Sequence, residues 1–342
     1  MNCEKMTLTA FTVFLHIIIA TMTTAPVSAR VIHISFEESS GAGSGDTDVK
    51  TEFDIDLGEL AVEYFQNGTQ KKESFETLID INQRAQNKNM SESHVDSSEN
   101  NLQRARRNIF GDDGRLPVDN SNYLPYCAVG YLDTGCTAAF IGPYHALTAA
   151  HCVYDIATNT WKQNLNLWRG RTCSTNGQRM YWARVWSVTG YTDNHRPDHD
   201  YALIIYNQKN RSPCWLSFGY WDIWPDVGFD IFGYPEDKLS VSGCSYNSMW
   251  FTSCHYSDTL DSGRRYKYRC DTLPGNSGSA LYAEKKGDSS GSRVVYGVHT
   301  HGAGTTIWNY GNRIDKSRFC QIVQWMKDSG YTPMCGSSAC CS

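Results

Sequence analysis

The last two-thirds of this 342-residue chain predict an all-β fold that ends in one helix. From residue 108 onward, short runs rich in Val, Ile, Tyr and Phe alternate with turns that contain Gly, Pro, Asn or Asp, which is typical of many short strands. This region of roughly 235 residues is large enough for two small barrels, although one larger sandwich fits the same pattern. The predicted strands include 136–141, 146–150, 201–206, 229–232, 280–283 and 294–298.

Helical spacing is clear in one segment, Lys316–Asp328. Its apolar side chains recur at intervals of three and four residues and share one face: Phe319, Ile322, Val323 and Met326. We therefore predict a C-terminal helix that buries this face.

The N-terminus has the pattern of a signal peptide. Residues 8–22 are apolar apart from one His and a few hydroxyls, and the run is short for a membrane span. Small residues at 27–29 suit signal peptidase, so we predict a signal peptide over 1–29, cleavage after Ala29 and secretion of the remaining chain. An uncleaved membrane anchor is the alternative.

Composition changes sharply at residue 107. Residues 30–107 hold no cysteine, carry 15 acidic and 9 basic side chains, and end on the basic run 104–107, which resembles a furin-type processing site. We predict a partly disordered propeptide over 30–107, cleaved after Arg107 by a furin-like protease, and a folded domain over 108–342 that begins at Asn108. Residues 52–66 mix acidic and apolar side chains and could pack against that domain. A solvated charge cluster is the alternative meaning of the basic run.

Net charge excludes some partners. The whole chain is −5 and the propeptide is near −6, so the domain from Asn108 onward is near +1. This balance predicts neither nucleic-acid binding nor membrane binding.

The distribution of cysteines predicts disulfides. Of 13 cysteines, Cys3 lies in the signal peptide and the other 12 all lie beyond residue 126, in an exported region. Zinc is the competing interpretation, but the cysteines do not form opposed C-x-x-C pairs, so we expect no metal and no other cofactor. Three sequons permit glycosylation and are weak signals individually: Asn67, Asn89 and Asn210.

Three separate segments supply the groups that acyl transfer by a hydroxyl requires. Such chemistry needs a nucleophile on a tight turn, a base beside it, an acid that orients the base, and backbone donors for an oxyanion. His151 ends a run of small residues, Asp200 precedes an apolar strand 49 residues later, and Ser277 lies between glycines a further 77 residues on. Asp198 is the rival acid, but it follows Pro197 and stands further from the apolar strand.

These segments resemble the trypsin-like serine peptidases. The family motifs T-A-A-H-C, D-x-A-L and G-D-S-G are matched in order at 148–152, 200–203 and 275–278, with Asn276 in place of Asp. The order His, Asp, Ser differs from that of subtilisin and of the α/β-hydrolases. The resemblance implies two six-stranded antiparallel barrels of the chymotrypsin type with a C-terminal helix.

The same resemblance implies roles for individual residues. Ser277 attacks the substrate, His151 relays the proton, and Asp200 orients the imidazole. The amides of Gly275 and Ser277 form the oxyanion hole. A disulfide between Cys136 and Cys152 is implied as well, and it pins the loop that carries the histidine.

Asn276 points to one branch of the family. Trypsin and its nearest relatives pair the corresponding Asp with their new N-terminal ammonium group, so this chain cannot mature through the same salt bridge. It resembles instead the bacterial glutamyl endopeptidases, and the match at the start of the domain agrees with cleavage after Arg107. The segments that carry this resemblance are 109–115, 152–154, 233–238, 275–280 and 295–299.

In that branch, an acidic substrate side chain is bound by a histidine, a hydroxyl and the mature α-amino group. His299 and Thr272 match the first two positions, and Asn108 provides the third. Several donors suit this task because a desolvated carboxylate needs them. Asp271, however, matches the position of the Asp with which trypsin binds Arg and Lys, and facing the substrate it would repel Glu.

We therefore predict a secreted, monomeric serine endopeptidase that cuts protein or peptide substrates after Glu, or after Asp more weakly. Cleavage after Arg or Lys through Asp271 is one alternative. A secreted binding protein built on a non-catalytic protease fold is another, and the complete triad argues against it.

Overall fold

The computed structural model describes residues 31–38, 49–73, 77, 109–207, 212–220, 228–238, 242–284, 292–302 and 308–333. The chain divides into two compact units, Met1–Leu57 and Gly58–Ser342. The first contains the antiparallel hairpin of β1 (Val31–Glu38) and β2 (Val49–Asp56). The second contains the remaining described elements, including residues 58–73 of the predicted propeptide. The signal peptide, Arg107, Asn108 and the sequons at Asn89 and Asn210 lie outside the described residues.

Within the described part of the second unit, a nine-stranded antiparallel sheet runs in the order β12-β11-β6-β7-β8-β14-β13-β3-β4. Its central strands are buried along their whole length, because small residues in β7 and branched residues in β14 pack on both faces. The strands are β3 (Ala61–Phe65), β4 (Gln70–Lys72), β6 (Val129–Leu132), β7 (Cys136–Gly142), β8 (His145–Thr148), β11 (Leu167–Arg169), β12 (Gln178–Met180), β13 (Trp182–Val188) and β14 (Ala202–Tyr206).

A seven-stranded sheet runs in the order β15-β18-β19-β20-β17-β16-β5, and β15 pairs with β16 as well as with β18. Six of its strands therefore close into a ring, which leaves no free edge between them. The strands are β5 (Leu116–Pro117), β15 (Gly228–Gly233), β16 (Trp250–Leu260), β17 (Arg265–Tyr268), β18 (Ala280–Glu284), β19 (Arg293–Gly302) and β20 (Asn309–Arg313).

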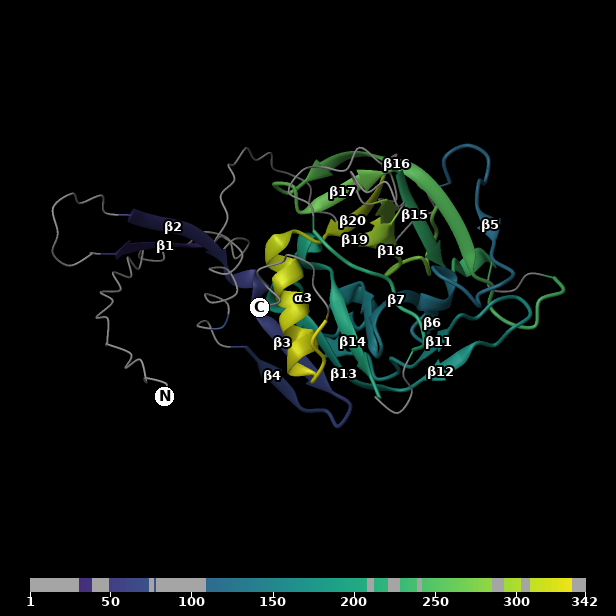
Figure 1. Cartoon of the computed structure of the whole chain (residues 1–342), viewed down its shortest axis with the longest axis horizontal. Coiled ribbons are helices and arrows are strands. Elements are labelled where there is room, and N and C mark those ends of the chain that lie inside the picture. The colour runs from purple at the N-terminus through teal and green to yellow at the C-terminus, as the bar shows by residue number, and fades with distance from the viewer. Residues whose placement is uncertain are drawn as a thin grey trace, which may run out of the picture. The chain divides into compact units, whose positions relative to one another are not determined.

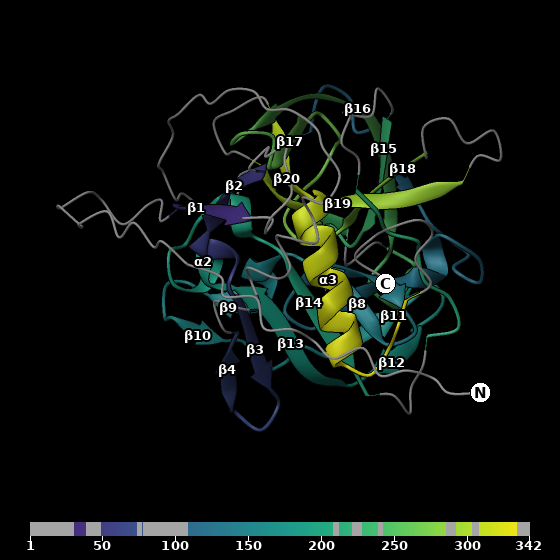
Figure 2. The same ribbon diagram turned by 60° about the vertical axis from the view of Figure 1, so that its left-hand side comes forward.

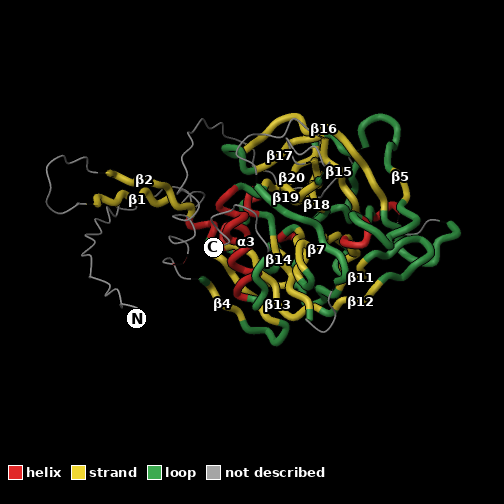
Figure 3. The backbone as a smooth tube through the Cα atoms, viewed as in Figure 1, coloured by secondary structure: helices red, strands yellow, loops and turns green. Residues whose placement is uncertain are grey.

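The remaining elements are short, apart from the C-terminal helix. Figure 3 shows the dominance of strands over helices in this unit. The remaining described elements are the paired strands β9 (Tyr154–Asp155) and β10 (Thr160–Trp161) and seven helical segments. These are the 3-10 helices η1 (Leu57–Glu59), η2 (Tyr126–Ala128), η3 (Ala150–Cys152), η4 (Pro197–His199) and η5 (Glu236–Lys238), and the α-helices α2 (Thr189–Thr192) and α3 (Lys316–Asp328).

Helix α3 spans the predicted residues and buries the predicted face. Asp315 caps it by accepting a hydrogen bond from the Arg318 amide at 2.9 Å, and Trp325 stacks on Trp186 of β13. None of the described helices is long and apolar enough to cross a membrane.

The prediction of an all-β double barrel with a C-terminal helix is confirmed. In both ribbon views, β15 to β20 occupy one half of the second unit and β6 to β14 the other (Figures 1 and 2). The sheets have nine and seven strands where six were predicted for each barrel, and two of the additional strands, β3 and β4, come from before residue 108 and extend the first sheet at β13.

Candidate active site

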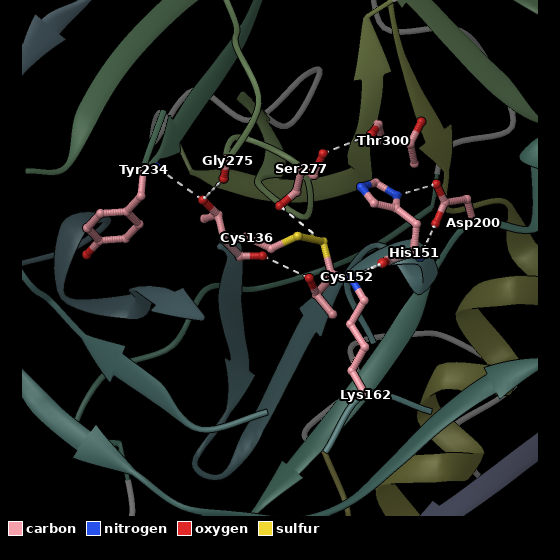
Figure 4. The surroundings of a disulfide bond; sticks show 11 residues. Cys136, His151, Cys152, Lys162, Asp200, Tyr234, Gly275, Ser277 and Thr300 are labelled. Carbon is pink, nitrogen blue, oxygen red and sulfur yellow. Dashed lines mark hydrogen bonds and ion pairs between the residues drawn. A yellow bond between two sulfur atoms is a disulfide. The ribbon is translucent and has the colours of Figure 1, made fainter. Parts of the chain in front are cut away.

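The three predicted catalytic residues come from three different elements. His151 lies in η3, Asp200 follows η4, and Ser277 lies in the turn before β18. Figure 4 shows the imidazole of His151 between the side chains of Asp200 and Ser277.

Asp200 holds His151 through two contacts. One carboxylate oxygen, Oδ1, accepts the backbone N–H of His151 at 2.8 Å, and Oδ2 lies 2.7 Å from the ring atom Nδ1. Asp200 is only 3% exposed, and burial by itself opposes ionisation. The charge and hydrogen bonds of His151 outweigh burial and hold the pKa of Asp200 below its ordinary value. The acid is thus an ionised acceptor that fixes the ring's orientation.

The rival acid is engaged elsewhere. Asp198 pairs with Arg196 at 2.8 Å and with Nδ1 of His199 at 3.2 Å. Asp200 is therefore the carboxylate that meets His151, in agreement with the preference drawn from the sequence.

Ser277 sits on a turn that glycines make possible. Gly275 and Gly278 have φ values of +97° and +87°, and a Cβ added at Gly278 would lie 2.1 Å from the carbonyl oxygen of Thr137. The Ser277 hydroxyl donates to the carbonyl oxygen of Thr300 at 3.1 Å. Among the described residues, the amides of Gly275 and Ser277 have no protein acceptor, so both are available to an oxyanion.

Thr137, which the sequence did not single out, braces this turn. Its hydroxyl donates to the carbonyl of Gly275 at 2.8 Å and accepts the amide of Tyr234 at 3.0 Å. Its own amide donates to the carbonyl of Ser277 at 2.9 Å. One fully buried residue therefore holds the carbonyl groups of Gly275 and Ser277, through its hydroxyl and its backbone amide respectively.

A disulfide lies beside the candidate catalytic residues (Figure 4). Cys136 of β7 is bonded to Cys152 of η3, which fixes the segment that carries His151. Cys152 Sγ also lies 3.6 Å from the Ser277 carbonyl. Further bonds join Cys127 to Cys214, Cys173 to Cys244 and Cys254 to Cys270.

The same disulfide limits metal binding here. Candidate ligand atoms of Cys136, His151 and Cys152 lie within 4.8 Å of one another. Both sulfurs are consumed by the bond between them, so the imidazole is the one remaining ligand of this group.

A pocket opens beside Ser277. Its lining includes both residues predicted to bind an acidic substrate and a second histidine, and consists of Thr272, Leu273, Pro274, Ser277, His299, His301 and Gly302. His299 is 2% exposed and Thr272 is 3% exposed. The second histidine lies two residues after the first in β19, and this proximity in the sequence is the signal that could have identified it.

The pKa values of both imidazoles lie well below 7, so both rings are neutral at that pH. Burial, together with the charges of neighbouring histidines, lowers the pKa of His299 to about 3, and burial lowers that of His301 to about 4. Nδ1 of His299 lies 2.6 Å from the hydroxyl of Tyr268. With Tyr268 as the donor in this contact, the neutral ring carries its proton on Nε2 and can donate from that atom.

Asp271 is occupied by the start of the predicted mature domain. Its two carboxylate oxygens accept the backbone amides of Phe110 at 2.8 Å and of Gly114 at 2.9 Å. Asp271 is 8% exposed and does not line the pocket. The structure therefore brings Thr272 and His299 to the candidate site, whereas the carboxylate of Asp271 binds residues 110–114 at the start of the predicted mature domain.

Comparisons with known proteins agree with this arrangement. The family model described as Trypsin matches residues 114–326. The glutamyl endopeptidase of Bacillus licheniformis is 27% identical over 234 residues, which cover 64% of this chain and 69% of that protein. A solved structure described as Glu endopeptidase in complex with MPD is 26% identical, has a TM-score of 0.56, and is matched over 64% of this chain and 99% of its own.

One relative differs in its described activity. The protein called inactive serine protease 35 of Rattus norvegicus is 33% identical over 292 residues, which cover 65% of this chain and 69% of that protein. Sequence similarity to this chain is therefore shared by a protein described as inactive, and similarity alone does not establish catalysis.

Proposed function

Because this chain belongs to the trypsin family, we propose that it is a secreted serine endopeptidase that cuts after Glu, or after Asp more weakly. The observation that carries the proposal is the pair of contacts through which Asp200 holds His151, with Ser277 on the adjoining turn. Its activity is hydrolysis of a peptide bond through an acyl-enzyme.

The proposed mechanism begins with a rotation of Ser277. Its hydroxyl leaves the Thr300 carbonyl and turns about the Cα–Cβ bond toward Nε2 of His151. Nε2 takes the proton as the oxygen attacks the substrate carbonyl, and Asp200 stabilises the imidazolium that results. The amides of Gly275 and Ser277 donate to the oxyanion. The imidazolium then protonates the leaving amine, and water attacks the acyl-enzyme in the reverse sequence of steps.

Specificity for an acidic side chain is supported by the contents of the pocket. A Glu carboxylate there finds a hydroxyl on Thr272 and imidazole donors on His299 and His301. Because a carboxylate favours the charged form of a neighbouring imidazole, its arrival raises the histidine pKa and converts a neutral contact into a charge-assisted one. Asp271 does not line this pocket, and both of its oxygens accept backbone amides of the segment 110–114.

We propose that maturation completes the pocket. Cleavage after Arg107 creates an α-amino group on Asn108, two residues before Phe110, which spans at most about 7 Å of chain. The Phe110 amide is bound to Asp271, whose neighbour Thr272 lines the pocket. A cation therefore forms within reach of the proposed carboxylate site only after processing.

The test is a comparison of matched peptides that differ only in the residue before the cut: Glu, Gln, Arg or Leu. With protein cleaved after Arg107, we expect the largest kcat/KM for the Glu peptide. His299→Leu removes a hydrogen bond to an ionised partner, worth about 1.5–3 kcal/mol, and costs roughly 10- to 100-fold on Glu. The same variant barely changes cleavage of the Leu peptide, because that side chain never used the imidazole. A wild-type preference for Arg would refute the specificity proposal.

A non-catalytic role is the second candidate, since a relative described as inactive is 33% identical. A serine-directed fluorophosphonate separates the two. An active enzyme is labelled at one site, and Ser277→Ala abolishes the label. A protein that folds and is secreted but takes up no label favours the binding role.

A further inference from the structure

Residues 58–73 are an integral part of the unit that carries the candidate active site. β3 pairs antiparallel with β13 along its whole length (Figures 1 and 2). The ladder continues at both ends, since Thr189 donates its amide to Leu60 at 2.8 Å and Gln66 donates to Ala183 at 2.9 Å. This segment covers an edge of β13 whose backbone groups would otherwise face water.

Its side chains fill part of the core. Ala61 and Val62 are fully buried, and Tyr64 is 7% exposed. The ring of Tyr64 stacks on Trp161 with centroids 5.1 Å apart and lies 6.2 Å from the ring of Trp182. Loss of the segment would expose these two tryptophans, and an apolar patch of this kind is costly in water.

Glu59 supplies a buried negative charge for two arginines. Its Oε1 accepts from Arg264 at 3.0 Å and from Arg318 at 3.4 Å, and Tyr201 donates to its other oxygen. Burial opposes ionisation of this carboxyl, but the charge of Arg318 and the contacts with His199 hold the pKa of Glu59 well below its ordinary value. Arg318 is only 2% exposed. Without Glu59, its buried guanidinium would lose its nearest carboxylate, which is strongly unfavourable.

The same cluster supports the turn that bears the candidate catalytic acid. Nε2 of His199 lies 3.3 Å from Glu59, and Arg318 donates to the carbonyl oxygen of Asp198. Asp200 is the next residue after His199 in the chain. Glu59 thus contacts the 3-10 turn that places the carboxylate beside His151.

The bound segment leaves the pocket accessible. Its contacts lie along β13, at the β9–β10 pair, where Trp161 donates to Gln70 at 2.9 Å, and around Glu59 in the cluster with Arg264, Arg318 and His199. The pocket beside Ser277 is lined by residues from 272 to 302. A retained segment therefore has no need to leave before substrate binds.

We propose that residues 58–73 stay on the catalytic domain after the chain is cut at Arg107, so that the processed protein is a complex of two chains. The former propeptide then provides a permanent strand and a buried carboxylate rather than a detachable inhibitor. The inference rests on the cleavage assigned in the proposed function.

The test separates this inference from that function. Residues 104–107 of the full chain are replaced by the recognition sequence of a site-specific viral protease, and the purified protein is cut in vitro. Native gel filtration at micromolar concentration is followed by a denaturing gel. We expect both fragments in one peak at a 1:1 ratio. Separate elution of the N-terminal fragment, with a domain that retains its native circular dichroism, would overturn the proposal. Neither result depends on furin or on peptide specificity.

Matched variants locate the anchor. Glu59→Gln removes the buried charge, whereas Lys72→Gln breaks a solvent-exposed pair in which the side chains of Lys72 and Asp193 are 51% and 43% exposed. After cutting, we expect the Kd between the two fragments to be about 100-fold larger in Glu59→Gln than in wild type. The reason is that breaking a buried ion pair costs far more free energy than breaking a solvated one. Equal dissociation in both variants and wild type would refute the role of Glu59.

A second measurement covers a variant that fails to fold before cutting. The wild-type fragments are separated in urea, and the domain is refolded with or without a synthetic peptide of residues 58–73. Native circular dichroism only with the peptide supports the proposal. Complete refolding without it contradicts the proposal.

Discussion

Thr137→Val is an isosteric change that tests how the candidate oxyanion hole is held. The hydroxyl of Thr137 donates to the Gly275 carbonyl at 2.8 Å and accepts the Tyr234 amide at 3.0 Å. Valine keeps the shape of the side chain but makes neither hydrogen bond. Thr137 is fully buried, so water cannot replace the hydroxyl without rearrangement.

The magnitude follows from the two groups left unpaired. Each buried donor or acceptor without a partner costs about 1–3 kcal/mol, so we expect a loss of about 2 kcal/mol or more in the free energy of unfolding. The Gly275 carbonyl belongs to the peptide that joins Gly275 to Asn276, so its release loosens Gly275 and, with it, the orientation of the Gly275 amide in the preceding peptide. Complete loss of one such donor lowers kcat by about 10²–10³-fold. Because the peptide is freed rather than removed, we expect a decrease in kcat of about 10-fold or more, with little change in KM.

The assay combines urea unfolding with kcat and KM on the Glu peptide. Thr172→Val is the matched control, because the Thr172 hydroxyl is equally buried and has no hydrogen-bond partner among the described residues. We expect this control to be as stable and as active as wild type. Wild-type stability and kcat in Thr137→Val would refute the reasoning.

Three other outcomes are expected. Ser277→Ala lowers kcat on the order of 10⁴-fold or more without shifting the urea midpoint; near-normal hydrolysis would exclude the triad assignment. Asp271→Asn offers one acceptor oxygen to the two amides of Phe110 and Gly114, so kcat/KM falls by a similar factor for Glu and Arg peptides. A loss confined to Arg peptides would show that Asp271 binds substrate. Burial, aided by the charge of Arg184, lowers the pKa of His145 to about 3. Between pH 7 and pH 5, His145 therefore becomes protonated only in the unfolded state, and the free energy of unfolding falls by about 2 kcal/mol. In His145→Phe, urea unfolding at pH 7 and pH 5 should show a smaller change in the free energy of unfolding than in wild type. An unchanged pH dependence would contradict the role of His145.

Local patterns in the sequence predicted several of the central strands and helix α3. Alternation of apolar runs with turn residues depends on neighbours in the chain, so β7, β14, β15, β18 and β19 were predictable. The edge of the first sheet was not. β3 pairs with β13 more than a hundred residues away, and nothing in the local sequence specifies which strand an acidic and apolar segment will join.

The candidate triad was predictable for a different reason. Motifs around His151, Asp200 and Ser277 are short, ordered and specific, and each lies on a turn that its own residues determine. The orientation of Asp271 was not predictable from its position in the sequence. It depends on contacts with residues 110–114, which lie at least 157 positions earlier in the chain.

The sequence by itself therefore determined the fold class, the family resemblance and the residues with catalytic chemistry. Tertiary structure alone decided which distant groups meet: the hydroxyl of Thr137 and the carbonyl of Gly275 are 138 residues apart, and Glu59 and Arg318 are 259 apart. The physical reason is that a hydrogen bond or ion pair requires atoms within about 3–4 Å of each other. Strand register and packing set those distances, and separation along the chain does not reveal them.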